Sequence, residues 1–158
     1  MRIYTTKEML QKAIQRSLEI GTLKGSFMNG DRSIVGCLGE LAFQDAYLSA
    51  ELCNTYDFDF RLKGKTIDVK SRIAKAPINQ TFDFTLPCLK KDQEVDFYVF
   101  AAVYWNFEYV DLLGYLPYKE FVSLRSRVKK GDPMPQGGYF RSDGFQVFVG
   151  DFQALKGK

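Results

Sequence analysis

The stretch from residue 56 to residue 71 constrains the fold of this chain more than any other part of the sequence. It reads Tyr-Asp-Phe-Asp-Phe-Arg-Leu-Lys-Gly-Lys-Thr-Ile-Asp-Val-Lys-Ser. Apolar and polar residues alternate on both sides of Lys63 and Gly64, which predicts a β-hairpin. A turn centred on those two residues sets Leu62 opposite Lys65 and so fixes the register of the predicted pair of strands.

The same register brings charged side chains together on one face of the predicted hairpin. Asp57 is expected to face Lys70, and Asp59 is expected to face Asp68, because directly opposed residues share a face. Two opposed acids repel each other and weaken a sheet. A divalent cation bound at this face would offset that cost. The apolar side chains expected on the buried face are Phe58, Phe60, Ile67 and Val69.

The composition is that of one folded domain, residues 1–158. Apolar residues make up 46% of the chain and aromatic residues 15%, which excludes a disordered protein. The net charge of +3 permits a nucleic-acid partner without requiring one. Cys37, Cys53 and Cys88 form no CxxC pair, which argues against disulfides and structural zinc and favours a reducing cytoplasm. We see no signal-peptide core and no membrane-spanning run, so no membrane partner is expected.

The chain contains no histidine. This removes the usual general base, the Ser-His and Cys-His nucleophile pairs, and the commonest ligand for zinc and copper. The remaining chemistry depends on carboxylates, lysine, tyrosine and hard metal ions. Oxygen-rich ligands favour magnesium, for which manganese can substitute.

The rest of the pattern predicts an α/β or α+β fold, with a mixed β-sheet flanked by helices. Thr5-Thr6-Lys7-Glu8 is typical of a helix start. Gly36 and Gly39 are costly inside a helix, which predicts close approach of the sheet backbone. The helices are predicted at 6–20, 31–50 and 117–128, the further strands at 81–85, 96–104 and 109–116, and a C-terminal β-hairpin at 139–149.

Three segments together resemble a known family of nucleases. Gly-Glu-Leu-Ala-Phe at 39–43 lies on a predicted helix, Tyr-Asp-Phe at 56–58 opens the hairpin, and Ile-Asp-Val-Lys-Ser at 67–71 lies on its second strand. This order resembles the PD-(D/E)xK nuclease superfamily, whose members share a restriction-endonuclease-like or Holliday-junction-resolvase-like fold. The resemblance implies a core at about 31–128 and a small stand-alone member of the phage or mobile-element type.

The resemblance also implies roles for individual residues. Asp57 and Asp68 would hold Mg²⁺ together with the Val69 carbonyl, and Lys70 would position the attacking water. Glu40 would bind a second ion or fix a water. The expected activity is metal-dependent endonucleolytic hydrolysis of DNA. The expected form is a homodimer or higher homo-oligomer in the cytoplasm, that of the host if the protein is phage-encoded.

Several alternatives stay open at this point. Asp59 competes with Asp57 for the second acidic position, and Asp57 with Lys70 could form only an exposed ion pair. The chain could be a catalytically inactive nucleic-acid-binding or interaction module, or could bind a metal only for stability. Possible nucleic-acid contacts after the second strand are Arg72, Lys75, Asn79 and Gln80.

Overall fold

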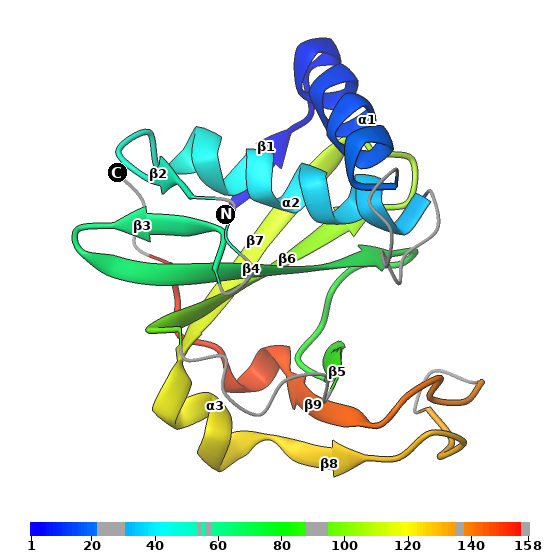
Figure 1. The fold of residues 1–158 in the computed structure, drawn as a ribbon. Coiled ribbons are helices and arrows are strands. Elements are labelled where there is room, and N and C mark those ends of the chain that lie inside the picture. The colour runs from blue at the N-terminus through cyan, green and yellow to red at the C-terminus, as the bar shows by residue number, and fades with distance from the viewer. Residues whose placement is uncertain (22–30, 54, 56–57, 88–94, 135–137, 156–158) are drawn as a thin grey trace.

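A computed structural model describes residues 1–21, 31–53, 55, 58–87, 95–134 and 138–155. Helices are interspersed with longer runs of strands along these residues (Figure 1). The elements in chain order are β1 (Arg2–Tyr4), α1 (Lys7–Gly21), α2 (Asp31–Ala46), β2 (Glu51–Leu52), β3 (Phe60–Leu62), β4 (Lys65–Ala74), β5 (Asp83–Pro87), β6 (Phe97–Tyr104), β7 (Tyr109–Pro117), α3 (Tyr118–Leu124), β8 (Ser126–Val128), β9 (Gly144–Phe148) and the 3₁₀-helix η1 (Val149–Asp151).

A six-stranded mixed sheet forms the centre of the molecule, in the order β1-β7-β6-β4-β3-β2. Strands β4 and β6 are parallel, whereas every other pair in this sheet is antiparallel. Parallel neighbours need a long crossover, and residues 75–96 supply it. Helices α1 and α2 lie on one side of this sheet (Figure 1). The predicted mixed α+β class is therefore confirmed.

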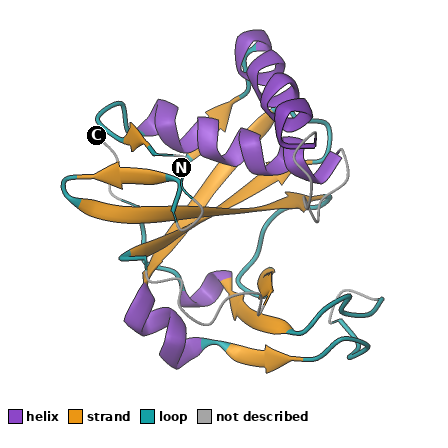
Figure 2. Ribbon diagram, viewed as in Figure 1, coloured by secondary structure: helices purple, strands orange, loops and turns teal. Residues whose placement is uncertain are grey.

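A second, three-stranded sheet lies on the other side of the central sheet, in the order β5-β9-β8 (Figure 2). Two apolar clusters fill the layers. One joins α2 to the central sheet through residues such as Leu38, Phe43 and Val69. The other joins the central sheet to the second sheet and α3 through Phe84 and Phe100, whose ring centroids lie 5.1 Å apart.

The predicted hairpin and its register are confirmed over β3, whereas the predicted pairing of Asp59 with Asp68 is not part of the ladder and that of Asp57 with Lys70 lies outside the described residues. Leu62 pairs with Lys65, and Phe60 pairs with Ile67. Lys63 and Gly64 have φ values of 50° and 76°. A two-residue turn with positive φ at both central positions matches the right-handed twist of the strands it joins.

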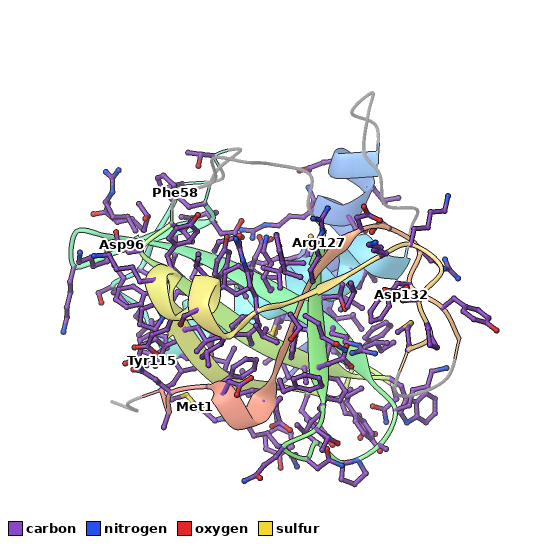
Figure 3. The ribbon with its side chains drawn as sticks, turned by 90° about the horizontal axis from the view of Figure 1, so that it is seen from below. Met1, Phe58, Asp96, Tyr115, Arg127 and Asp132 are labelled. Atoms are coloured by element: carbon purple, nitrogen blue, oxygen red, sulfur yellow. The ribbon has the colours of Figure 1, made fainter. Side chains whose placement is uncertain are left out.

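The regular pairing ends at Phe60, and the expected apolar face changes there. The amide of Asp59, the residue before Phe60, donates to the carbonyl of Ile67 at 2.9 Å. Asp59 therefore does not continue the ladder beyond the Phe60–Ile67 pair. Phe58 consequently packs against the second apolar cluster rather than beside Phe60. Figure 3 places Phe58 toward the same end of the molecule as Asp96, which precedes β6. The prediction that Phe58 shares the face of Phe60 was wrong.

The segments after β7 also differ from the sequence prediction. Helix α3 ends at Leu124, and Ser126–Val128 forms strand β8 instead of a last helical turn. The predicted hairpin at 139–149 is replaced by pairing of β9 with both β5 and β8. The strand that follows the third helix thus belongs to the second sheet and not to the central one.

The structure confirms the predicted start of the first helix. The amide of Met9 donates to Thr6 Oγ1 at 3.1 Å, which caps α1 at its N-terminus. A Cβ on Gly39 would lie 1.9 Å from Ser71 Oγ on β4, so this glycine permits close approach of α2 to the sheet, through side chains rather than the predicted backbone. A Cβ on Gly36 would meet nothing within 4 Å. The packing explanation was therefore right for Gly39 and wrong for Gly36.

Candidate active site

Strand β4 presents an acid and a lysine on one face. Side chains two residues apart on a strand point the same way, and Lys70 Nζ lies 2.5 Å from Asp68 Oδ2. Asp68 is only 4% exposed, whereas a third of the Lys70 side chain remains accessible. The ammonium also lies 5.9 Å from the centroid of the Tyr98 ring. The pair is thus covered on the side of the acid and open on the side of the lysine.

Asp59 joins this pair because the β3–β4 ladder is interrupted. Its Oδ2 accepts a hydrogen bond from the Val69 amide at 2.7 Å, in place of a backbone carbonyl from the neighbouring strand. Burial raises its pKa to about 8, and repulsion from Asp68 and Glu40 adds to the effect. The Asp68 carboxyl contributes to the raised pKa of Asp59, so the two acidic groups lie close together. A proton or a cation between two neighbouring carboxyls relieves their repulsion.

Glu40 comes from α2 and completes the acidic group. Burial, and to a smaller extent the charge of Asp68, raises its pKa to about 7, although the charges of Arg16 and Lys70 lower it. The structure therefore brings together Glu40, Asp68 and Lys70, three residues that the sequence assigned to one site. Asp57 lies outside the described residues, so its role stays a prediction, and Asp59 is the second-motif acid that the described cluster contains.

Arg16 on α1 is a member of this cluster that the sequence analysis missed. Its Nη1 is buried and forms no hydrogen bond among the described residues, and its charge favours the ionised form of Glu40. Met9, Ala13 and Ser17 lie on the inner side of α1, at the spacing of one helical face. Arg16 falls on that face, and a cation within it is the signal that could have identified the residue.

The donor set is chemically suited to a hard divalent ion. The converging side chains offer only carboxylate oxygens, which Mg²⁺ and Mn²⁺ prefer. Among the described residues, no group of three or more acidic or cysteine side chains forms a ready-made ligand cage. Mg²⁺ commonly uses one or two carboxylates and completes its shell with water and substrate phosphate. The Asp59–Asp68 pair meets that smaller requirement.

A groove opens beside Lys70, between the central sheet and the second sheet. It has a volume of about 490 Å³ and runs from Gly36 on α2 across β4 to β5 and to the segment around Tyr139. The residues of β4 that line it are Val69, Lys70, Ser71 and Arg72. The accessible end of Lys70 is therefore reached from this groove.

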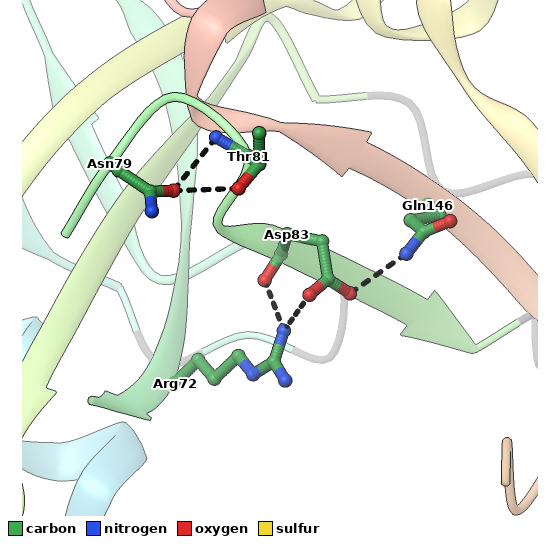
Figure 4. Close-up of polar contacts among 5 residues, drawn as sticks. All are labelled: Arg72, Asn79, Thr81, Asp83 and Gln146. Atoms are coloured by element: carbon green, nitrogen blue, oxygen red, sulfur yellow. Dashed lines mark hydrogen bonds and ion pairs between the residues drawn. The ribbon is translucent and has the colours of Figure 1, made fainter. Parts of the chain in front are cut away.

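Arg72 has a partner within the protein (Figure 4). Its guanidinium donates to the side-chain carboxylate of Asp83 and, at 2.5 Å, to the backbone carbonyl of the same residue. Gln146 Nε2 donates to the other carboxylate oxygen at 3.0 Å. These contacts tie β4 to β5 and β9, and they account for Arg72 without a nucleic acid. Lys75 and Gln80 are exposed, as a surface contact requires.

The chain matches no model of a known protein family and no curated protein. Within the described part of the chain, no helix has both the length and the apolar character needed to cross a membrane.

Proposed function

We propose that this protein is a divalent-metal-dependent endonuclease that hydrolyses phosphodiester bonds in DNA. The observation that carries the proposal is the convergence of Glu40, Asp59 and Asp68 with Lys70 at the side of an open groove. Structural ion pairs do not require three acids around one lysine. A metal-assisted hydrolase can use such a cluster, because it needs a hard-ion site next to a group that orients the attacking water.

Each residue of the cluster would have its own role in the reaction. Asp59 and Asp68 would hold the ion with the Val69 carbonyl, and Glu40 would hold a water or a second ion. A bound Mg²⁺ would neutralise phosphate oxygens and lower the pKa of a coordinated water. Lys70, held by Asp68, would orient that water toward the phosphorus. Arg16 would keep Glu40 ionised from the side of α1.

The chemical order along the chain supports the same class. The helical acid precedes a hairpin whose second strand carries acid-x-lysine, which is the pattern of the PD-(D/E)xK superfamily. We also propose that the central sheet and its helices form a restriction-endonuclease-like core. Asp59, rather than Asp57, is our choice for the second acid, because the charges of Asp68 and Glu40 act on it.

The test is cleavage of supercoiled plasmid, linear duplex, branched and single-stranded DNA with Mg²⁺ or Mn²⁺, compared with EDTA. We expect cleavage by the wild type and none by Lys70→Ala or Asp68→Asn. Lys12→Ala is the matched control, since this lysine is exposed on α1 and is not among the possible nucleic-acid contacts. Equal cleavage by Lys70→Ala would indicate a contaminant or another site. DNA binding without cleavage by the wild type would favour the inactive binding module.

A further inference from the structure

The groove beside Lys70 is lined by cations and by no acid among the described residues. Lys70, Arg72 and Arg141 contribute side chains to its wall. Lys70 is paired with Asp68, and Arg72 is paired with Asp83. Arg141 is exposed and has no hydrogen bond or ion pair to any described residue. Its charge is available to a bound anion.

An aromatic ring lines the same groove as Arg141. Tyr139 lines the groove and is 70% exposed. An exposed aromatic ring next to a phosphate-binding cation is the arrangement by which proteins hold single-stranded nucleic acid, with a base stacked on the ring. Paired bases in a duplex are already stacked on their neighbours and do not offer a free face.

The backbone that carries these two side chains is held in place by the residue between them. Phe140 is 6% exposed and anchors the segment in the interior. Its amide donates to the Asp132 carbonyl at 2.9 Å, and its carbonyl accepts from the Gly131 amide at 2.8 Å. Because alternate residues of an extended segment point to opposite sides, Tyr139 and Arg141 are directed away from this anchor. A fixed platform loses less entropy on binding than a mobile one.

The opposite wall of the groove is kept small. Gly36 lines it from α2, and a Cβ at this position would meet nothing within 4 Å. Glycine inside a helix costs ~1 kcal/mol relative to alanine, and packing does not require it at position 36. The need to keep the groove open explains the glycine instead. Its volume of about 490 Å³ falls within the roughly 300–1,000 Å³ of ligand sites.

We propose that this groove binds an unpaired DNA strand, with Tyr139 stacked on a base and Arg141 bound to a phosphate, next to Lys70. The substrate would then be single-stranded DNA, or the unpaired part of a flap or junction, in preference to continuous duplex. This inference rests on the proposed function and specifies its substrate.

The experiment measures the binding of a fluorescein-labelled oligothymidylate by fluorescence anisotropy in EDTA, so that no cleavage occurs. We expect Tyr139→Ala to weaken binding by about 5- to 150-fold, which corresponds to the ~1–3 kcal/mol of one base–aromatic stack. Tyr139→Phe keeps the ring and should bind as the wild type does. Arg141→Ala should reduce the salt dependence of log Kd by about 0.7, as expected for one phosphate contact on a single strand.

Matched controls lie far along the chain from the groove. Tyr4 is 72% exposed on β1, and Lys12 is exposed on α1. Alanine at either position should leave binding unchanged. Gly36→Leu should weaken binding by filling the groove, whereas its thermal unfolding should show a folded protein. Unchanged binding in both Tyr139→Ala and Arg141→Ala, or tighter binding of a duplex of equal length, would overturn the inference.

Cleavage measured in parallel separates this inference from the proposed function. If the wild type cleaves DNA with Mg²⁺ and Tyr139→Ala raises KM at unchanged kcat, both proposals stand. If Tyr139→Ala cleaves with the wild-type KM, the substrate inference fails and the nuclease stands. If the wild type cleaves nothing, the nuclease fails, and the anisotropy still decides whether the groove binds an unpaired strand.

Discussion

Replacing Asp59 by asparagine should stabilise the metal-free protein, an unusual outcome for a substitution in a buried site. Asparagine can still accept the hydrogen bond from the Val69 amide, which now ends at Asp59 Oδ2 at 2.7 Å. It removes the negative charge that Asp68 and Glu40 repel. The account therefore predicts that the folded protein gains from the loss of an acid.

The size of the gain follows from the pKa of Asp59, which rises from 3.8 to about 8 on folding. At about 1.4 kcal/mol per pKa unit, this difference sets an upper limit of roughly 6 kcal/mol. We expect ~1–3 kcal/mol, the usual cost of an uncompensated buried polar group. In a domain of this size each kcal/mol corresponds to about 2–4 °C in melting temperature.

The gain must also depend on pH. At low pH, below 3.8, the carboxyl is neutral in both the folded and the unfolded chain and contributes nothing. As the pH rises toward about 8, the unfolded chain ionises while the folded chain keeps its proton, so the wild type loses stability. Asp59→Asn does not titrate here and avoids that loss. The difference between the two proteins should therefore grow across this interval.

The assay is urea unfolding in EDTA near pH 4 and near pH 9, followed by circular dichroism. Asp45→Asn is the control, since this acid is exposed on α2, and a change within about 0.5 kcal/mol is expected for it. Equal or lower stability of Asp59→Asn at alkaline pH would refute the reasoning. A gain of the same size at both pH values would refute it as well.

Three further predictions concern stability. Gly36→Ala should raise the free energy of unfolding by about 1 kcal/mol, because alanine is the better helix former. Gly39→Ala should lower it by about 1–3 kcal/mol, because the added Cβ overlaps with Ser71. Urea unfolding measures both changes. Arg72→Ala leaves the buried Asp83 carboxylate without its cation, which costs about 3 kcal/mol and lowers the melting temperature in calorimetry by about 6–12 °C. Mn²⁺ at one hundred times its Kd should stabilise the wild type by about 2.7 kcal/mol.

Each of these predictions has an outcome that would contradict it. Equal effects of alanine at Gly36 and Gly39 would mean that α2 does not approach β4 as described. An unchanged melting temperature in Arg72→Ala, with Lys75→Ala as the exposed control, would remove its structural role and return it to the possible nucleic-acid contacts. Stabilisation of Asp59→Asn and wild type by Mn²⁺ to the same extent would separate Asp59 from the metal.

The hairpin could be predicted from the sequence because local rules determine it. Alternation of side chains and a two-residue turn at Lys63-Gly64 fix the pairing of Leu62 with Lys65. The position of Asp59 could not be predicted in the same way. Its side chain replaces a backbone acceptor for the Val69 amide, and such an exchange leaves no trace in the apolar pattern.

The second sheet was missed because its pairing is not local. β9 pairs with β5, which lies some sixty residues earlier, and the register joins Thr85 to Gln146. Neither segment identifies its partner by composition. Residues 126–128 were predicted to belong to the helix at 117–128, but the helix ends at Leu124. The groove depends on this sheet, so the sequence analysis could identify Lys70 but not the space in front of it.

The most direct test of the central claim is an anomalous difference map from crystals soaked in Mn²⁺. The account predicts a manganese peak between the carboxylates of Asp59 and Asp68, on the side of Glu40 and within reach of Lys70. A map with no peak at this cluster, or with peaks only at surface acids such as Asp45, would contradict the assignment of these residues to a metal-dependent active site.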